Sequence, residues 1–137
     1  MSQSNATENA TLKMHLQGTD PAYRANATQY LALVTGVSVD EANPLANECT
    51  YTGYARIPVT KATAWVDNGS NFVNAALLQW GKRTDGGATQ SASHVLIVDT
   101  VSGAVAQCII CALAANLDIA QNIQPQLAAG DLTVTSD

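Results

Sequence analysis

The pattern closest to a chemical motif is a pair of cysteines, Cys108 and Cys111, in a C-x-x-C arrangement. Such a pair can hold half of a zinc site or act as a redox couple. In an extended segment, however, residues three positions apart point to opposite faces of the sheet, so the two thiols diverge. The two histidines, His15 and His94, are far apart in sequence, and Cys49 falls in a polar loop. We therefore predict three reduced, buried cysteines, and no metal or cofactor.

Other residue combinations that could support catalysis are incomplete. A triad could be drawn from His94, Asp99 and a serine, but no Gly-x-Ser-x-Gly nucleophile elbow is present. Asp40–Glu41 could begin a calcium loop, yet the required pattern of oxygen ligands does not follow. Gly86–Gly87 lacks the Lys-Ser/Thr pair of a phosphate-binding loop, and Lys82–Arg83 is expected at a solvated loop tip. The carboxylates are expected in solvated turns. We predict no catalytic residues and no enzymatic activity.

The segments that carry these residues are predicted to be mostly strands. The run at 30–35 is apolar throughout, which indicates a strand buried on both faces. Pro58 indicates a sheet edge or a bulge, because proline cannot donate to a ladder. Ser102–Gly103 is expected to form a tight turn. Strands are predicted at 30–35, 53–60 with an extension at 62–66, 71–80, 93–100, 104–113, 117–124 and 132–135. The spacing favours an all-β fold, an antiparallel, jelly-roll-like β-sandwich of about seven or eight short strands.

Residues 1–20 differ from the predicted sandwich domain at 21–137. Ser4 or Thr7 could cap a short helix, and Gly18 could end it. A helix this short is marginal by itself, so it must dock on its own domain or on a partner. The apolar side chains of this arm are candidate partner-binding residues: Leu12, Met14 and Leu16.

Composition restricts the classes of function. The 137 residues are 47% hydrophobic, which is enough for one domain with a core. Only 12% are charged and the net charge is -5, so we predict no nucleic-acid binding. No apolar run reaches the roughly 18 residues of a membrane helix, and no secretory signal is visible, so no membrane association is expected. A neutral polar surface of this kind suits assembly.

Four stretches in order carry a resemblance to a known family. The first is Leu16-Gln17-Gly18-Thr19 and the second is residues 30–36. The third is residues 51–56 leading into 59–60, with Asn74-Ala75-Ala76 downstream, and the fourth is residues 128–134, preceded by 94–99 and 102–103. Together they resemble small tailed-phage virion proteins, a family of capsid decoration (cement) proteins often labelled as tail fibre proteins. The family's hairpin is more aromatic than Cys108-Ile109-Ile110-Cys111, so the packing there is expected to differ. The resemblance implies a structural role and no catalytic residues.

The resemblance implies a decoration protein on the outer surface of the phage head. Such a protein, expected as a homotrimer, would bridge subunits of the major capsid protein, with residues 1–20 as the tether. The acidic balance suits the outside of a particle. One alternative is a tail fibre or baseplate component. Another is a host-glycan-binding module, for which the aromatic candidates are Tyr23, Tyr51, Tyr54, Trp65 and Trp80.

Overall fold

A computed structural model describes residues 2–135 and defines their secondary structure. The helices are α1 (Asn5–Gln17) and the 3-10 helix η1 (Ala22–Ala25). The longer strands are β2 (Thr28–Thr35), β3 (Ile57–Thr60), β7 (Gln90–Val98) and β8 (Cys108–Ile119). The shorter strands are β1 (Ser2–Gln3), β4 (Trp65–Asp67), β5 (Phe72–Asn74), β6 (Leu78–Gln79), β9 (Gln126–Leu127) and β10 (Thr133–Val134).

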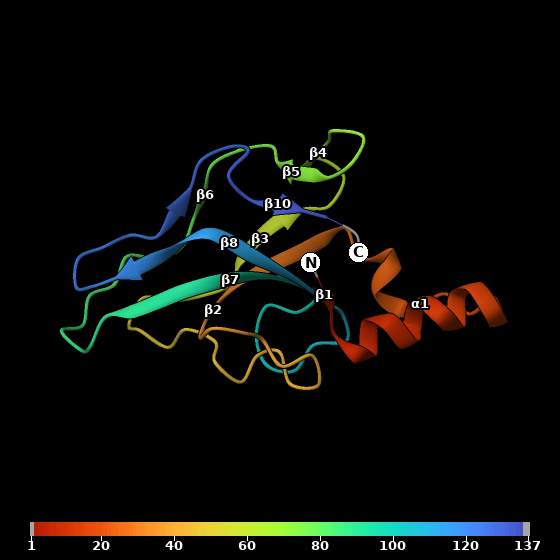
Figure 1. Ribbon diagram of the computed structural model, residues 1–137, viewed down its shortest axis with the longest axis horizontal. Coiled ribbons are helices and arrows are strands. Elements are labelled where there is room, and N and C mark those ends of the chain that lie inside the picture. The colour runs from red at the N-terminus through yellow and green to blue at the C-terminus, as the bar shows by residue number, and fades with distance from the viewer. Residues whose placement is uncertain (1, 136–137) are drawn as a thin grey trace.

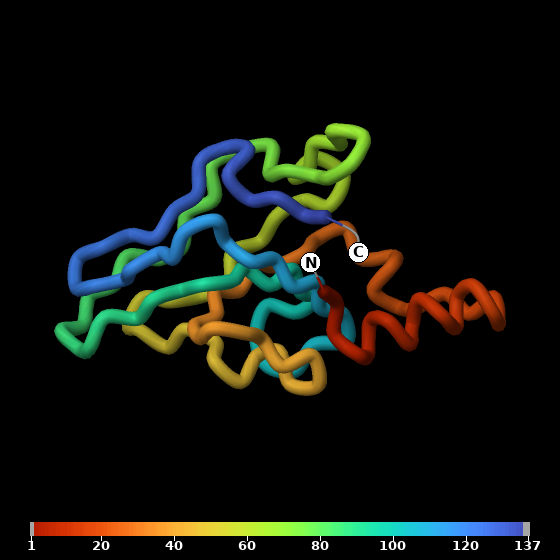
Figure 2. The backbone as a smooth tube through the Cα atoms, viewed as in Figure 1, coloured from red at the N-terminus to blue at the C-terminus, as the bar shows by residue number. Residues whose placement is uncertain are grey.

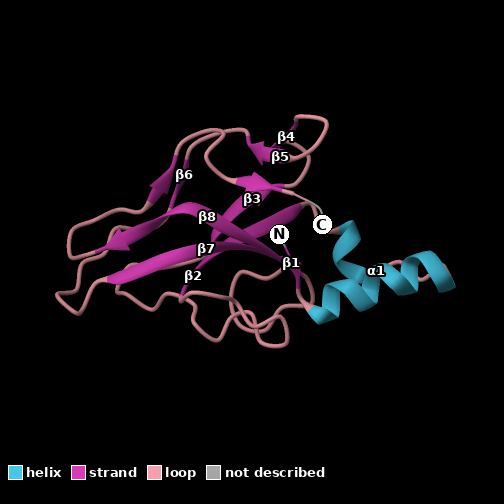
Figure 3. Cartoon of the chain, viewed as in Figure 1, coloured by secondary structure: helices cyan, strands magenta, loops and turns pink. Residues whose placement is uncertain are grey.

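The described strands form three antiparallel sheets (Figure 1). The main sheet has five strands in the order β1-β8-β7-β2-β3. A three-stranded sheet, β10-β5-β4, and a two-stranded sheet, β6-β9, complete the set. Loops and strands make up most of the chain, and α1 lies at one end (Figure 3). The predicted all-β class with a short N-terminal helix is therefore confirmed, although short separate sheets take the place of a continuous second one.

Apolar residues cover both faces of the main sheet. On β2, Leu31 and Leu33 belong to a core cluster that also contains Trp80 and Leu132 from the later part of the chain. The alternate residues Ala32 and Val34 belong to a second cluster on the opposite face, against Val39, Leu45 and Val105 from two loops. The prediction that this strand is buried on both faces is confirmed, because loops cover the face that the short sheets leave open.

The pairing of β7 with β8 is interrupted by a bulge of several residues on β8. The ladder joins Ala92 to Leu117 and His94 to Ala112, so residues 113–116 of β8 stand opposite Ser93 alone. The separate strands predicted at 104–113 and 117–124 are thus one strand with a bulge, and that prediction was wrong. The β7–β8 connection is also longer than the predicted tight turn, since it spans residues 99–107.

A buried asparagine divides the strand that was predicted at 71–80 into β5 and β6. The amide of Asn74 donates to the carbonyls of Ala76 (2.8 Å) and Ala128 (2.9 Å), and its oxygen accepts from the amide of Leu132 (2.9 Å). These bonds turn the chain after β5 and hold the corner against the segment that leads into β10. A single polar side chain therefore overrides the local apolar pattern.

The first β segment after the acidic loop is shorter than predicted. The strand expected at 53–60 begins at Ile57, and β3 is an edge strand of the main sheet, as Pro58 indicated. The expected extension at 62–66 is interrupted by a turn before β4. Upstream, Gly53 has a φ of 103° and lies so close to Gly81 that a Cβ built on Gly81 would be 1.8 Å from the Gly53 carbonyl oxygen. This close backbone contact requires glycine.

Candidate binding surfaces

The helix α1 is fastened to the main sheet at its first turn. The Ser4 side chain caps the helix by accepting from the amide of Thr7, as the sequence predicted, and Gly18 ends it in the left-handed conformation. The Thr7 hydroxyl accepts from the amide of Cys108 (2.8 Å) and lies 3.3 Å from the carbonyl oxygen of the same residue. The Ser4 amide donates to that carbonyl (3.0 Å). These buried bonds join the start of the helix to β8.

Beyond this attachment the helix extends away from the body of the molecule (Figure 2). The candidate partner-binding residues divide between two sides of it. Leu12 and Leu16 are 58% and 79% exposed and, four residues apart, lie on one face. Met14 is half-buried, and its sulfur lies 3.8 Å from a guanidinium nitrogen of Arg24 in η1. The structure therefore leaves two leucines, which we call the leucine face, free for contact with another molecule.

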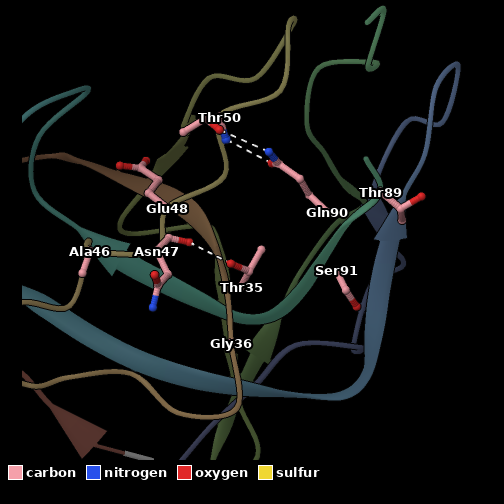
Figure 4. Close-up of a pocket in the computed structure, with 9 residues that line it drawn as sticks. All are labelled: Thr35, Gly36, Ala46, Asn47, Glu48, Thr50, Thr89, Gln90 and Ser91. Atoms are coloured by element: carbon pink, nitrogen blue, oxygen red, sulfur yellow. Dashed lines mark hydrogen bonds between the residues drawn. The ribbon is translucent and has the colours of Figure 1, made fainter. Parts of the chain in front are cut away.

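A polar cleft of about 460 Å³ lies where the ends of β2 and β7 meet the loop before Cys49 (Figure 4). Its neutral polar groups bond mainly to one another. The Gln90 amide oxygen accepts from the Thr50 backbone amide (3.0 Å), and its nitrogen lies 3.1 Å from the Thr50 hydroxyl. The Thr35 hydroxyl lies 3.4 Å from the Asn47 carbonyl oxygen. The cleft can offer hydrogen bonds to a neutral polar ligand, and its lining includes one carboxylate, that of Glu48.

The histidine considered for a triad lies near this cleft and makes no triad. Its Nδ1 is 2.8 Å from the hydroxyl of Ser93, which also contacts the carbonyl of Gly36. The carboxylate of Asp99 instead accepts from the backbone amides of Ala106 (3.0 Å) and Gln107 (3.1 Å) and orders the β7–β8 loop. Burial lowers the pKa of His94. The side chains of Ser93 and Asp99 therefore bond to backbone groups, those of Gly36 and of the β7–β8 loop, and not to each other.

An ion pair between Arg56 and Glu48, which was not predicted from the sequence, lies next to the cleft. It joins the loop before Cys49, the segment before β3 and the β7–β8 loop. Arg56 donates to both carboxylate oxygens of Glu48 (2.8 and 2.9 Å) and to the carbonyls of Thr100 (3.0 Å) and Gly103 (2.9 Å). The Tyr54 hydroxyl lies 2.8 Å from Glu48 and accepts from the Leu33 amide (3.0 Å). Burial, with the nearby Glu48 carboxylate, raises the pKa of Tyr54, and the hydrogen bond to Glu48 raises that of Arg56. A lone charge on an alternating segment was the only sequence signal for this network.

The predicted solvated loop tip at Lys82–Arg83 is wrong for the arginine. Arg83 is buried, and its guanidinium donates to the carbonyls of Ala88 and Ile119, both at 2.7 Å, and to the carboxylate of Asp85. The hydrogen bond from Arg83 is the main cause of a lowered pKa for Asp85. The carboxylates of Glu48 and Asp85 were expected in solvated turns, but each pairs with a buried arginine, Arg56 and Arg83 respectively.

The aromatic residues considered for sugar binding are mostly unavailable. Trp80 is fully buried, with its indole nitrogen donating to the Leu31 carbonyl (3.0 Å), and Tyr51 is 4% exposed. Tyr54 is committed to the ion-pair network described above. Tyr23 and Trp65 remain partly exposed, on separate parts of the surface from the polar cleft. Within residues 2–135, the five aromatic candidates therefore do not come together in one exposed surface that could stack against a sugar.

The three cysteines are free and buried, as predicted. Cys108 and Cys111 belong to different core clusters, which confirms that they point to opposite faces of β8. Burial raises the pKa of Cys49 to about 11 and that of the other two to about 12. Among residues 2–135, no group of three or more potential ligands could hold a metal ion. No helix in the described part of the chain is long and apolar enough to cross a membrane.

These features define a small antiparallel β-sheet protein with one projecting helix. The family described as "Podophage GP4 fiber I protein gp80" matches residues 2–135. The chain belongs to this family and is therefore a structural protein of the tailed-phage virion. A comparison with curated proteins finds no match.

Proposed function

We propose that this chain is a structural subunit of a phage fibre. The observation that carries the proposal is the family match, which covers nearly the whole chain and whose description names a fibre protein. The role is one of assembly, and catalysis and cofactors form no part of it. The fibre role, held as an alternative at the start, is thus preferred to the decoration of the phage head.

The surface of the chain supports an assembly role. The first turn of α1 is bonded to the sheet, and the leucine face lies exposed farther along the helix. The helix therefore holds an apolar surface in a fixed position relative to the sheet, where another molecule can contact it. The low charge, 12% of residues, limits repulsion between neighbouring subunits. The proposed partners are other copies of this chain, with the homotrimer as the expected form, and a virion protein to which the fibre attaches.

Labelling of purified virions tests the location. Antibody raised against this chain, carried on gold particles and viewed by electron microscopy, should mark filaments at the tail. Excess purified protein should abolish the labelling, which controls for specificity. Labelling spread over the head, as expected for a decoration protein bound to the major capsid protein, would contradict the fibre role.

The folded domain can also be tested for the glycan-binding alternative. The polar cleft offers hydrogen bonds but none of the five predicted aromatic residues lines it. We therefore expect no binding on a host-glycan array. Binding that is lost in a Gln90→Ala variant, and kept in a variant of the exposed Gln126 of β9, Gln126→Ala, would assign a receptor role to the cleft.

A further inference from the structure

An apolar slot of about 350 Å³ lies between the main sheet and the sheet β10-β5-β4. The side chains of Trp65, Phe72 and Val134 line it on one side, and Ile109 of β8 lines it on the other. The indole nitrogen of Trp65 donates to Gln29 (3.0 Å), so the polar edge of this ring is satisfied within the molecule. Phe72 is 46% exposed. The slot thus presents an apolar concave surface to solvent.

The same molecule carries a matching convex surface that does not fill the slot. Leu12 and Leu16 form a ridge one helical turn long, and both are more than half exposed. In the view of Figure 1 the helix projects outward below β4, β5 and β10. Each copy therefore has one exposed ridge and one exposed slot.

Charges flank the two surfaces in a complementary way. Glu8 lies one turn before Leu12 on the leucine face, and Lys13 directly follows Leu12. Lys61 lines the slot. Asp67 lies in the adjoining depression that shares Phe72 and Val134 with the slot. A helix seated with Glu8 toward Lys61 pairs unlike charges at the first end of the contact. Lys13 lies between the two leucines along the axis and to one side of the leucine face, from which its long side chain can reach Asp67.

We propose that the leucine face of one copy docks in the slot of a second copy. The contact rests on the self-association that the proposed function includes, and it names the two surfaces that meet; it does not depend on where in the virion the subunit lies. Each copy donates one helix and receives one, so the contact joins two different surfaces. Such a contact forms a ring where its rotation closes, and we expect closure at the trimer.

The strength of this contact follows from the two leucines. Their exposed fractions are 58% and 79%, and burying them against Trp65 and Phe72 removes most of that apolar surface from water. Replacing both with asparagine should weaken self-association roughly a hundredfold. The helix itself should remain attached, because its bonds to β8 lie at Ser4 and Thr7.

Sedimentation velocity over a range of protein concentrations provides the first test. The wild-type chain should pass from monomer to a closed oligomer as concentration rises, and the Leu12→Asn/Leu16→Asn variant should remain monomeric at the same concentrations. Val37→Asn provides a control, since Val37 is likewise an exposed apolar residue but lies in the loop after β2. A wild-type monomer at all concentrations, or an equal effect of the control, would overturn the proposal.

Disulfide trapping tests which surfaces meet. The natural cysteines are buried, so single introduced thiols report contacts without interference. With copper–phenanthroline and dissolved oxygen as the oxidant, a Leu16→Cys protein mixed with an Ala62→Cys protein should form a mixed disulfide faster than it does with a Val37→Cys protein. The reason is that Ala62 lines the slot and is exposed. Faster pairing of Leu16→Cys with itself would indicate helix-to-helix contact and overturn the proposal.

Discussion

Replacement of Arg56 by methionine should destabilise the fold strongly. The guanidinium holds Glu48 through two bonds and the β7–β8 loop through the carbonyls of Thr100 and Gly103. Removing one partner of a buried pair typically costs about 3–5 kcal/mol. The side chain of Glu48 is 21% exposed, so water can compensate part of the loss. We expect a loss of about 3 kcal/mol in the free energy of unfolding and a Tm lower by about 10 °C.

Urea unfolding followed by circular dichroism measures this loss. The matched control is Arg24→Met, whose pair with Asp20 is more than half exposed on both side chains and should change stability by less than about 0.5 kcal/mol. A Glu48→Gln/Arg56→Met double variant should lose less than the two single losses combined, by about 1 kcal/mol or more. A loss below about 1 kcal/mol for Arg56→Met would refute the view that this pair holds the three segments together.

Four further predictions rest on other contacts. Thr7→Val leaves the Cys108 amide without its partner and should cost about 1–2 kcal/mol, with faster hydrogen exchange in the first turn of α1. The three buried thiols should not react with a thiol reagent in the folded protein and should react fully in denaturant. Because burial lowers the pKa of His94, the unfolded chain binds this proton more tightly, so stability should be full above pH 6.5 and fall below it, and His94→Gln should flatten that dependence in pH-resolved melts. Gly81→Ala should prevent stable folding, as judged by the loss of a cooperative melt. Gly86→Ala should melt like the wild type, because its added Cβ would make only ordinary van der Waals contact with the side chain of Gln121, at 3.7 Å or more.

The parts of the fold that follow local pattern could be predicted from the sequence. The capped helix, the apolar strand β2 and the edge position of Pro58 each depend on the residues of their own segment. The opposite orientation of Cys108 and Cys111 follows from strand geometry alone. These signals need no knowledge of the rest of the chain.

The parts that depend on distant partners could not be predicted. Asn74 looks like an ordinary strand residue until the segment that holds Ala128 and Leu132 lies beside it. Arg83 looks like half of a solvated pair, but its partner Ile119 is 36 residues away in sequence. The slot likewise exists only where β4, β5 and β10 come together over the main sheet. Its lining residues have no common spacing that a sequence pattern could detect.

The attachment of α1 to β8 also determines how a pulling force would enter the molecule. Tension applied along the helix passes through Ser4 and Thr7 to Cys108, at the beginning of the longest strand of the main sheet. From there it spreads into β7 over most of the length of the β7–β8 ladder. The pairing of β1 with β8 spans two residues, and the first turn adds only a few bonds, so this attachment should rupture before the β7–β8 ladder does. Under such a load the helix would detach from β8 first, and the β domain would stay folded.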